Sequence, residues 1–437
     1  MEFIASPGGQ LNGVIRVPGD KSMSHRSIML GALAEGVTQV EGFLEGDDAL
    51  ATLNAFRAMG VKIDGPHEGK VTLHGVGLYG LQAPQGDLDV GNSGTSMRLL
   101  AGLLAGQSFS VTLTGDVSLS KRPMERVAKP LRLMGATVET QEGGCPPMTI
   151  TGTRPLKAIH YDLPMASAQV KSCVLLAGLY AQGQVSTTEP ATTRDHTERM
   201  LNGFGYPVSV DGATAQLTGG GKLSARSIDV PADISSAAFF MVAASIAPGS
   251  DITLSHVGIN PTRVGVINIL RSMGADITLS NRKEIGGEPV ADIRVRYSAL
   301  SGVVIDQDQV PLAIDEFPVL FIAAACAQGT TVLTGAKELR VKESDRIQVM
   351  ADGLKSLGVR AQPTDDGIVI EGRAEQGAVM NGGRVNSHHD HRIAMSFVVA
   401  SLRASDPIII EDSDNVATSF PNFVELASAA GINVAVN

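Results

Sequence analysis

Positively charged side chains recur at helix starts in this sequence, together with Ser, Thr, Asn and Asp. Two examples are the run Lys21-Ser22-Met23-Ser24-His25-Arg26 and the run Asp390-His391-Arg392, which stand at the starts of helical stretches. Nine cations share this placement: Lys21, Arg26, Arg98, Arg122, Lys171, Arg194, Lys342, Arg346 and Arg392.

The polar residues in these clusters are ordinary helix caps, each contributing roughly 1 kcal/mol, and capping alone explains any single cluster. Capping does not require Lys or Arg, because the helix dipole disfavours a cation at the N-terminus by roughly 0.3 to 1 kcal/mol. Cations placed against the dipole, beside free N–H groups, indicate that an anion binds there. Phosphate and carboxylate groups suit the bidentate guanidinium. We therefore expect a site for one or more strongly anionic small molecules.

Two carboxylates stand out among these cations. Glu343 lies between Lys342 and Arg346, and Asp315 begins a turn before an apolar helical stretch. In a structural role, the two form an ion pair and a cap. In a catalytic role, one carboxylate removes a proton from a hydroxyl while the other donates a proton to carbon. The residues alone leave both interpretations open and do not indicate the substrate.

Two nucleotide-binding look-alikes fail on their context. The run from Gly75 to Gly80 matches G-x-G-x-x-G after a strand-like stretch, but residues 81–86 predict a loop where dinucleotide binding requires a helix. The run Gly19-Asp20-Lys21-Ser22 resembles the end of a phosphate-binding loop, but Asp20 separates Gly from Lys and the spacing is wrong. Neither predicts a nucleotide site.

His388, His389 and His391 form a dense cluster around Asp390. His and carboxylate side chains can bind zinc, but adjacent residues rarely converge on one metal and no matching distant pair is obvious. We expect no metal, and expect His391 to cap the helix or to orient a neighbouring Arg.

The elements that must position these residues repeat along the chain. A helical stretch that ends in Gly before a short strand occurs six times, at spacings of 69 to 84 residues, so six units of about 73 residues fill the chain. Each glycine sits where a helix C-terminus needs a left-handed residue. The six glycines are Gly60, Gly135, Gly205, Gly274, Gly358 and Gly431.

A second phrase, an apolar helical stretch followed by a turn and a β-branched strand, also occurs six times. Helices that are apolar on all sides are buried helices. Each unit thus has two helices, two strands and a further strand or two, which predicts an α/β fold. The apolar stretches are 30–36, 99–106, 174–183, 240–249, 320–329 and 397–405.

Composition excludes several classes of protein. A chain of 437 residues predicts two to four domains or one large repetitive fold, and 45 acidic against 35 basic residues argue against nucleic-acid binding. The N-terminus does not read as a signal peptide, and the longest apolar run, 237–247, is shorter than the about 20 residues that a membrane span needs. Cys145, Cys173 and Cys326 are scattered and odd in number, which predicts a reducing cytoplasm.

Five motifs follow one another in a specific order and spacing. They are Gly19-Asp20-Lys21-Ser22 with Ser24-His25-Arg26, Gly91-Asn92-Ser93-Gly94-Thr95, Lys121-Arg122-Pro123, Arg340-Val341-Lys342-Glu343-Ser344-Asp345-Arg346 and Asp390-His391-Arg392. Together they resemble the 5-enolpyruvylshikimate-3-phosphate synthase family, also called 3-phosphoshikimate 1-carboxyvinyltransferase. The resemblance covers the chain from end to end.

The resemblance implies a two-domain enolpyruvyl transferase fold of the α/β (α+β) class. Six βαβαββ repeats, three per domain, form an inside-out α/β barrel. The outer domain comprises residues 1–20 plus 232–437, the inserted domain comprises 21–231, and the active site lies in the cleft between them. The resemblance also implies a cytoplasmic protein, most simply a monomer, without metal or organic cofactor and without a nucleic-acid or membrane partner.

The resemblance further implies the reaction. The enolpyruvyl group of phosphoenolpyruvate moves to the 5-hydroxyl of shikimate 3-phosphate through a tetrahedral intermediate, with release of phosphate, in the shikimate pathway to chorismate and the aromatic amino acids. Lys21, Asp315, Lys342 and Glu343 are the implied catalytic residues. Asp315 takes the hydroxyl proton with Lys342 nearby, and Glu343 protonates the methylene carbon and then reverses that transfer.

The substrate contacts come from the same resemblance. Those implied for shikimate 3-phosphate are Lys21, Ser22, Arg26, Ser167, Ala168, Gln169, Arg194, Asp315 and Lys342. Those implied for phosphoenolpyruvate are Lys21, Gly94, Arg122, Gln169, Arg346 and Arg392.

Three positions depart from the pattern of many family members and indicate a more divergent branch. Ala168 stands where many carry Ser, Thr418 where many carry Lys, and Glu338 where Asn is frequent. The Gly94 position influences tolerance to glyphosate in this family, and Gly leaves room for that inhibitor.

Two other interpretations compete with this one. The related enolpyruvyl transferases that act on UDP-N-acetylglucosamine typically carry a reactive Cys shortly before their Arg-Pro pair, but here Val117 stands at that position, upstream of Arg122. The second is an inactive anion-binding scaffold on the same fold. Such a protein would be expected to lack Lys21, Asp315 or Glu343, and all three are present. Transfer to shikimate 3-phosphate is therefore the prediction.

Overall fold

The computed structural model describes residues 1–285, 287–374 and 377–437, and the chain divides into two compact units. Unit 1 comprises Met1–Pro18, Pro231–Lys283 and Pro289–Asn437, and unit 2 comprises Gly19–Val230 and Glu284–Glu288. Each unit has a hydrophobic core of its own. In sequence, most of unit 2 is one continuous stretch between the first strands of unit 1 and the remainder of that unit.

Unit 2 carries three four-stranded sheets in the part of the chain that the structure describes, with the strand orders β16-β3-β5-β4, β6-β7-β9-β8 and β11-β13-β15-β14. In each sheet the first pair is parallel and the other two pairs are antiparallel. The strands are β3 (Glu35–Glu41), β4 (Lys62–His67), β5 (Lys70–Val76), β6 (Leu88–Asp89), β7 (Ser110–Thr114), β8 (Thr137–Glu139), β9 (Met148–Thr151), β11 (His160–Asp162), β13 (Gln184–Thr188), β14 (Val208–Asp211), β15 (Thr214–Thr218) and β16 (Ser227–Asp229), with the short pair β10 (Leu156–Lys157) and β12 (Ala181–Gln182).

The helices of unit 2 alternate between two kinds. Helices α1 (Lys21–Leu33), α3 (Gly94–Ala105) and α5 (Ala168–Gly178) are buried along most of their length. The other kind leaves one side exposed to solvent: α2 (Asp47–Ala58), α4 (Glu125–Leu133) and α6 (His196–Gly203). The buried helices pack against one another, so their N-termini can place side chains from distant parts of the sequence together.

Unit 1 repeats the same pattern. Its sheets have the orders β2-β17-β19-β18, β20-β22-β21 and β23-β24-β1-β25, and the second gains a parallel bridge between Val304 and Val332. The strands are β1 (Phe3–Gly9), β2 (Asn12–Ile15), β17 (Asp251–Gly258), β18 (Asp276–Ile285), β19 (Glu288–Arg296), β20 (Gly329–Leu333), β21 (Arg360–Thr364), β22 (Gly367–Gly372), β23 (Gly383–Asn386), β24 (Ile408–Glu411) and β25 (Ile432–Val436).

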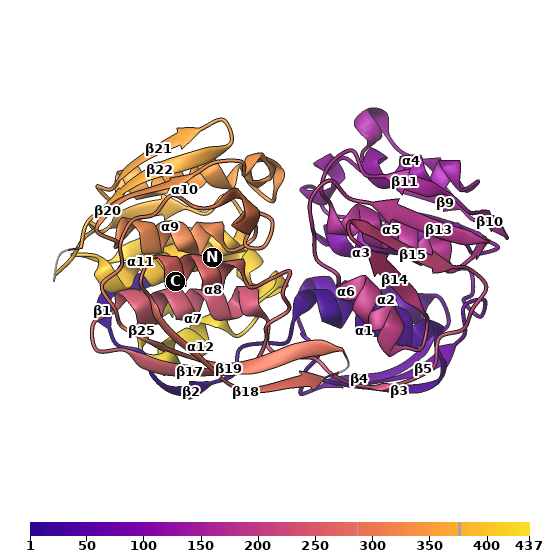
Figure 1. The fold of residues 1–437 in the computed structure, drawn as a ribbon, viewed down its shortest axis with the longest axis horizontal. Helices are drawn as coiled ribbons and strands as arrows, with labels where there is room; N and C mark the ends of the chain where they lie inside the picture. Colours follow the sequence, from indigo (N-terminus) through magenta and orange to yellow (C-terminus); the bar gives the residue numbers. More distant parts are fainter. Residues whose placement is uncertain (286, 375–376) are drawn as a thin grey trace. The chain divides into compact units, whose positions relative to one another are not determined.

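Helices α7 (Ile234–Ile246), α9 (Phe317–Ala325) and α11 (His391–Ala400) form the interior of unit 1. They contact one another and lie between the β20-β22-β21 sheet and the sheet that contains β17 and β19 (Figure 1). Helices α8 (Gly265–Ser272), α10 (Arg346–Ser356) and α12 (Phe423–Ala430) are partly exposed. Short 3₁₀ turns are η1 (Leu119–Lys121), η2 (Glu142–Gly144), η3 (Gln307–Gln309), η4 (Lys337–Val341), η5 (Ser401–Arg403) and η6 (Ser413–Thr418).

The prediction that a left-handed glycine ends one helix in each repeat is confirmed. All six glycines that follow the Gly-ending helical stretches have a positive φ, from 79° to 111°. Glycine adopts this left-handed conformation without the strain that a Cβ would cause, which explains why glycine stands where each of these helices ends. The predicted loop at 81–86 is also confirmed, since no helix follows β5 before α3. The α/β class predicted from the two recurring phrases is therefore confirmed as well.

Candidate active site

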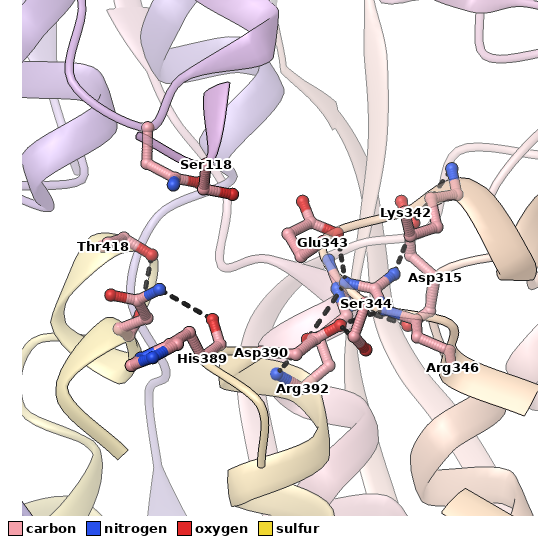
Figure 2. A network of polar contacts seen from close by, with 12 residues as sticks. Ser118, Asp315, Lys342, Glu343, Ser344, Arg346, His389, Asp390, Arg392 and Thr418 are labelled. Carbon is pink, nitrogen blue, oxygen red and sulfur yellow. Dashed lines mark hydrogen bonds and ion pairs between the residues drawn. The ribbon is translucent and has the colours of Figure 1, made fainter. Parts of the chain in front are cut away.

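Arg346 stands at the centre of an ion network in unit 1 (Figure 2). It is the first residue of α10, and Asp390 holds its guanidinium at two points, with Nε 2.8 Å from Oδ2 and Nη2 3.2 Å from Oδ1. Nη2 also donates to Glu343 at 2.6 Å, and Nη1 donates to Asp315 at 3.4 Å. Three carboxylates thus converge on one arginine.

The side chains of this network differ in how much of their surface is exposed to solvent. The side chains of Arg346 and Asp390 are 1% and 0% exposed, whereas those of Asp315 and Glu343 are 15% and 26% exposed. Burial works to lower the pKa of Arg346, but the carboxylates of Asp390, Glu343 and Asp315 outweigh it and hold that pKa above its ordinary value. The inner pair therefore anchors the network, and the two outer carboxylates remain within reach of a ligand.

Asp390 also links the network to helix α11. Its Oδ1 accepts a hydrogen bond from the backbone N of Arg392 at 3.0 Å, and its Oδ2 accepts one from Ser344 Oγ at 3.0 Å. The expectation that His391 caps this helix is wrong, because Asp390 is the N-cap and His391 is the first helical residue. A short carboxylate one position before the helix reaches the free N–H groups of the first turn.

Arg392 is held by the start of helix α9. Its Nη1 donates to the carbonyl of Asp315 at 3.0 Å and lies 3.7 Å from Oε1 of Glu316. Glu316 is buried, and its Oε1 accepts a hydrogen bond from Ser235 in the first turn of α7. The N-termini of the three buried helices of unit 1 therefore meet at this arginine.

Lys342 follows η4 and faces two carboxylates. Its Nζ lies 3.5 Å from Oδ1 of Asp315 and 2.7 Å from Oε1 of Glu338. Asp315 consequently has both Lys342 and Arg346 within 4 Å, and their charges lower the energy of its negative form. Sequence reasoning noted Glu338 only as a departure, and the structure shows that it holds the ammonium beside Asp315.

Thr418 lies in the same view of unit 1 (Figure 2). Its Oγ1 donates to the carbonyl of Asn415 at 2.7 Å, and Asn415 Nδ2 donates to the carbonyl of His389 at 2.6 Å. A hydrogen-bonded turn therefore occupies the position where many family members have a Lys.

Lys21 opens helix α1 in unit 2. Asp20 caps this helix by accepting a hydrogen bond from Met23 N at 2.8 Å, and Lys21 forms an ion pair with Asp48 in the first turn of α2. In the sequence, Asp48 appears only as part of the acidic pair Asp47-Asp48. Acidic residues are common in any first helical turn, so this pair did not indicate an ion pair with Lys21. Asp48 holds the predicted catalytic lysine and was missed.

Arg26 lies one turn further along α1 and is buried. Its Nε donates to Thr197 Oγ1 at 2.7 Å, Nη2 donates to Ser172 Oγ at 3.0 Å, and Nη1 donates to the carbonyl of Ser22 at 3.0 Å. Burial lowers the pKa of Arg26 to about 10. The nearby charge of Arg194 adds to that lowering, and Glu198 works against it.

The predicted residues at the start of α5 contact helix α3. Ser167 caps α5 and Ala168 is its first residue. Gln169 accepts a hydrogen bond from Arg98 Nη1 at 2.5 Å and donates one to Thr95 Oγ1 at 3.0 Å. The two helix starts are therefore joined through one amide side chain.

Arg122 lies close to Gly94, the first residue of α3. Its Nη2 donates to Asn92 Oδ1 at 2.7 Å and to Ser118 Oγ at 3.2 Å. A Cβ at Gly94 would lie 3.0 Å from Arg98 Nη1 and 3.4 Å from Arg122 Nη1. The absent side chain at Gly94 therefore lets two guanidinium groups approach this helix start.

Lys171 does not belong with the predicted anion-binding cations. Its side chain is buried, with Nζ 3.1 Å from Oε1 of Glu189 and 2.9 Å from Oε1 of Glu198. Two carboxylates already compensate its charge. The sequence places Lys171 at a helix start, but its partners come from the end of β13 and from α6, and no local pattern reveals them.

The structure brings the predicted residues together in two sets, one in each unit. Unit 1 joins Asp315, Lys342, Glu343, Arg346 and Arg392, which combine acid–base groups with cations. Unit 2 places Lys21, Ser22 and Arg26 on α1 and joins Gln169 to the start of α3. Over the described ranges, no cluster of His, Cys, Asp and Glu is arranged to hold a metal, and none of the helices is long and apolar enough to cross a membrane.

Solved structures share this architecture. The EPSP synthase from Acinetobacter baumannii matches with a TM-score of 0.92 at 62% identity, over 100% of this chain and 99% of that one. The enolpyruvyl transferase NikO from Streptomyces tendae matches with a TM-score of 0.79 at 16% identity, over 99% and 98% of the two chains, which compares the fold alone. The architecture is that of the enolpyruvyl transferases.

Sequence comparisons identify one family within the enolpyruvyl transferases. The family model of EPSP synthase (3-phosphoshikimate 1-carboxyvinyltransferase) matches residues 5–426. The 3-phosphoshikimate 1-carboxyvinyltransferase of Alkalilimnicola ehrlichii is 67% identical over 99% of this chain and 96% of its own length. That of Methylococcus capsulatus is 66% identical over 100% and 98%. The chain belongs to the EPSP synthase family and is a transferase, which confirms the resemblance predicted from the motifs.

Proposed function

We propose that the chain transfers the enolpyruvyl group of phosphoenolpyruvate to the 5-hydroxyl of shikimate 3-phosphate, and that Asp315 and Glu343 move the protons. One observation carries the assignment of roles. Asp315 and Glu343 both contact Arg346 yet keep part of their surface exposed, and Lys342 lies 3.5 Å from Asp315. The products are 5-enolpyruvylshikimate 3-phosphate and phosphate, on the shikimate pathway to chorismate.

The addition step uses both carboxylates. Asp315 takes the proton of the 5-hydroxyl, and the oxygen forms a bond to C2 of phosphoenolpyruvate. Glu343 donates its proton to the methylene carbon C3, which becomes a methyl group in the tetrahedral intermediate. Positioned proton donors and acceptors of this kind contribute roughly 10² to 10⁴ in rate.

The elimination step reverses one of these transfers. Glu343 takes a proton back from the methyl group, the C2–C3 double bond forms again, and the bond from C2 to the phosphate oxygen breaks. Phosphate leaves with that electron pair and accepts the proton held by Asp315. Lys21 and Lys342 offset the negative charge that develops, since fixed cations stabilise charge without reorganisation.

We propose that the two sets of residues act on one pair of substrates. For shikimate 3-phosphate, the proposed contacts are Lys21, Ser22, Arg26, Ser167, Ala168, Gln169, Arg194, Asp315 and Lys342. For phosphoenolpyruvate, they are Lys21, Gly94, Arg122, Gln169, Arg346 and Arg392. Two fixed anionic substrates approach the rate gain of an intramolecular reaction, in which orientation supplies several kcal/mol (about 7 to 11 at best).

The test is phosphate release from phosphoenolpyruvate with either shikimate 3-phosphate or UDP-N-acetylglucosamine as the acceptor. We expect release with shikimate 3-phosphate alone. Release only with the sugar nucleotide overturns the proposed acceptor and makes Val117 a misleading clue. No release with either acceptor, from a folded sample that binds both anions, supports the inactive scaffold instead.

We further propose a cytoplasmic monomer. The three cysteines are free, and Cys173 and Cys326 are buried, which raises the pKa of the Cys326 thiol to about 12 and suits a reducing compartment. Every proposed contact comes from a single chain, so a monomer suffices for the reaction. Light scattering of the purified protein measures the mass, and a stable dimer contradicts the monomer.

A further inference from the structure

A charged cluster buried in unit 2 takes no part in the proposed chemistry. The ammonium of Lys171 lies between the carboxylates of Glu189 and Glu198, at 3.1 and 2.9 Å, and all three side chains are buried. One cation and two carboxylates leave a negative charge inside the protein. Such a charge is costly unless further donors stabilise it.

Thr193 supplies donors of this kind. Its backbone N donates to Oε1 of Glu189 at 3.0 Å, and its Oγ1 donates to Oε2 of the same carboxylate at 2.5 Å. Thr193 immediately precedes Arg194 in the loop between β13 and α6. Glu189 therefore fixes this loop, through Lys171, to the interior of α5.

The same cluster connects to Arg26. Glu198 follows Thr197 in α6, and Lys171 precedes Ser172 in α5. Thr197 Oγ1 accepts a hydrogen bond from Arg26 and donates one to Ser172 Oγ at 2.7 Å. The Lys171–Glu198 ion pair and these hydrogen bonds thus join α5 to α6 through adjacent residues, beside the guanidinium of Arg26.

Arg194 lies three residues before Thr197, the hydroxyl partner of Arg26, so the loop brings a second cation toward Arg26. The charge of Arg194 is close enough to contribute to the lowered pKa of Arg26. Neighbouring arginines are unfavourable without a ligand, and favourable when an anion accepts hydrogen bonds from both. Thr193 is the backbone neighbour of Arg194, so its two hydrogen bonds to Glu189 help to set where the backbone of Arg194 lies.

We propose that Glu189 acts as a positioning residue, which holds Arg194 beside Arg26 through its two hydrogen bonds to Thr193 and thereby sets the affinity for shikimate 3-phosphate. Neither Glu189 nor Thr193 is among the proposed substrate contacts. This role rests on the proposed function, in which Arg26 and Arg194 bind that substrate.

The experiment compares two substitutions at Thr193 in the full-length protein. Thr193→Val removes the hydroxyl and keeps the branched shape, whereas Thr193→Ser keeps the hydroxyl. We expect Thr193→Val to raise KM for shikimate 3-phosphate about tenfold, the effect of one hydrogen bond to a charged group. The KM for phosphoenolpyruvate and kcat should stay at parent values. Tm should fall, because the buried carboxylate of Glu189 loses a donor, and Thr193→Ser should restore both Tm and KM for shikimate 3-phosphate.

Each other outcome overturns the inference. Parent values in Thr193→Val show that the loop needs no tie to Glu189. Equal rises in both KM values show a structural role only. A parallel variant, Arg194→Gln, separates the inference from its basis: an unchanged KM for shikimate 3-phosphate there refutes the proposed role of Arg194, whereas a large rise there with a silent Thr193→Val refutes the role of Glu189 alone.

Discussion

Arg346 in unit 1 and Arg26 in unit 2 are both buried at or near the start of a helix, but opposite surroundings hold them. Three carboxylates surround Arg346 and raise its pKa. Arg26 donates to two hydroxyls and a carbonyl, and burial lowers its pKa to about 10. Carboxylates outweigh burial around Arg346, whereas around Arg26 burial outweighs the opposing charges of Glu198, Asp20 and Glu288.

This difference indicates two tasks. A cation that is already paired keeps carboxylates such as Glu343 fixed and available for proton transfer. Arg26 donates to neutral oxygens, and burial outweighs the nearby carboxylates, so an anionic substrate replaces its lost solvation. The carboxylates around Arg346 are suited to acid–base chemistry, and the surroundings of Arg26 are suited to binding an anion.

The largest effect is expected from removing an acid in unit 1. Glu343→Gln should lower kcat by about 10² to 10⁴, because an amide cannot carry the proton although it still accepts a hydrogen bond from Arg346. Phosphate release at saturating substrates measures kcat. Glu371→Gln is the matched control, since Glu371 is an exposed partner of Arg360 at 3.0 Å and should leave kcat unchanged. A Glu343→Gln variant within about twofold of the parent removes the catalytic half of the comparison.

The two arginines themselves give the next test, through stability. Arg346→Met leaves Asp390 buried without its partner and should cost about 3 to 5 kcal/mol in the free energy of unfolding. Arg26→Met should cost only about 1 to 2 kcal/mol, because Thr197 and Ser172 already share a hydrogen bond of their own at 2.7 Å. Urea unfolding followed by circular dichroism measures both. Equal losses would mean that the two surroundings do not differ energetically.

A third test concerns the positive charge around α1 in unit 2. His25 is buried beside Thr52, and this burial, with the charges of Lys21 and Arg26, holds the pKa of His25 well below its ordinary 6.5. The unfolded chain therefore binds a proton below pH 6.5 that the folded chain refuses. Stability should fall as the pH drops below 6.5, by up to about 1.4 kcal/mol per pH unit from this group.

Urea unfolding midpoints between pH 7 and pH 5 measure this slope. His25→Gln should flatten it, while His388→Gln, at an exposed position, should keep it. Identical slopes in the parent and both variants contradict the proposed origin of the acid sensitivity.

The smallest effect is expected at Gly94. Gly94→Ala introduces a Cβ 3.0 Å from Arg98 Nη1 and 3.4 Å from Arg122 Nη1, both of which are ends of flexible side chains. We expect KM for phosphoenolpyruvate to rise about threefold, equal to about 0.6 kcal/mol, with kcat unchanged. Gly86→Ala meets no atom within 4 Å and serves as the control. A fall in kcat at Gly94→Ala would mean that the start of α3 does more than bind phosphoenolpyruvate.

The sequence predicted those parts of the fold that depend on local chemistry. The helix ends at Gly60 and its five counterparts need a left-handed residue, and the caps Ser93 and Ser167 need a side-chain oxygen, so each leaves a mark within a few residues. Apolar stretches likewise predicted the buried helices. The family resemblance predicted the fold and the reaction, while the individual substrate contacts remain predictions.

Partners from distant segments left no such mark. The sequence shows Lys171 at a helix start but not the two carboxylates that neutralise it, and Glu316 next to Asp315 but not its contact with Arg392. Asp48 is one of many acidic residues in first turns until the ion pair with Lys21 is seen. Tertiary packing decides which cation stays available for a ligand, and a one-dimensional pattern does not contain that information.

The pairing of strand β1 has a consequence for synthesis on the ribosome. β1 lies between β24 and β25, with Phe3 opposite both Ile410 and Val436. The first strand to be made therefore has no neighbour until nearly the whole chain has been translated, whereas residues 19–230 emerge as a stretch that contains all the strands of three sheets. Unit 2 can fold while translation continues, and unit 1 completes its last sheet only after the C-terminus has left the ribosome.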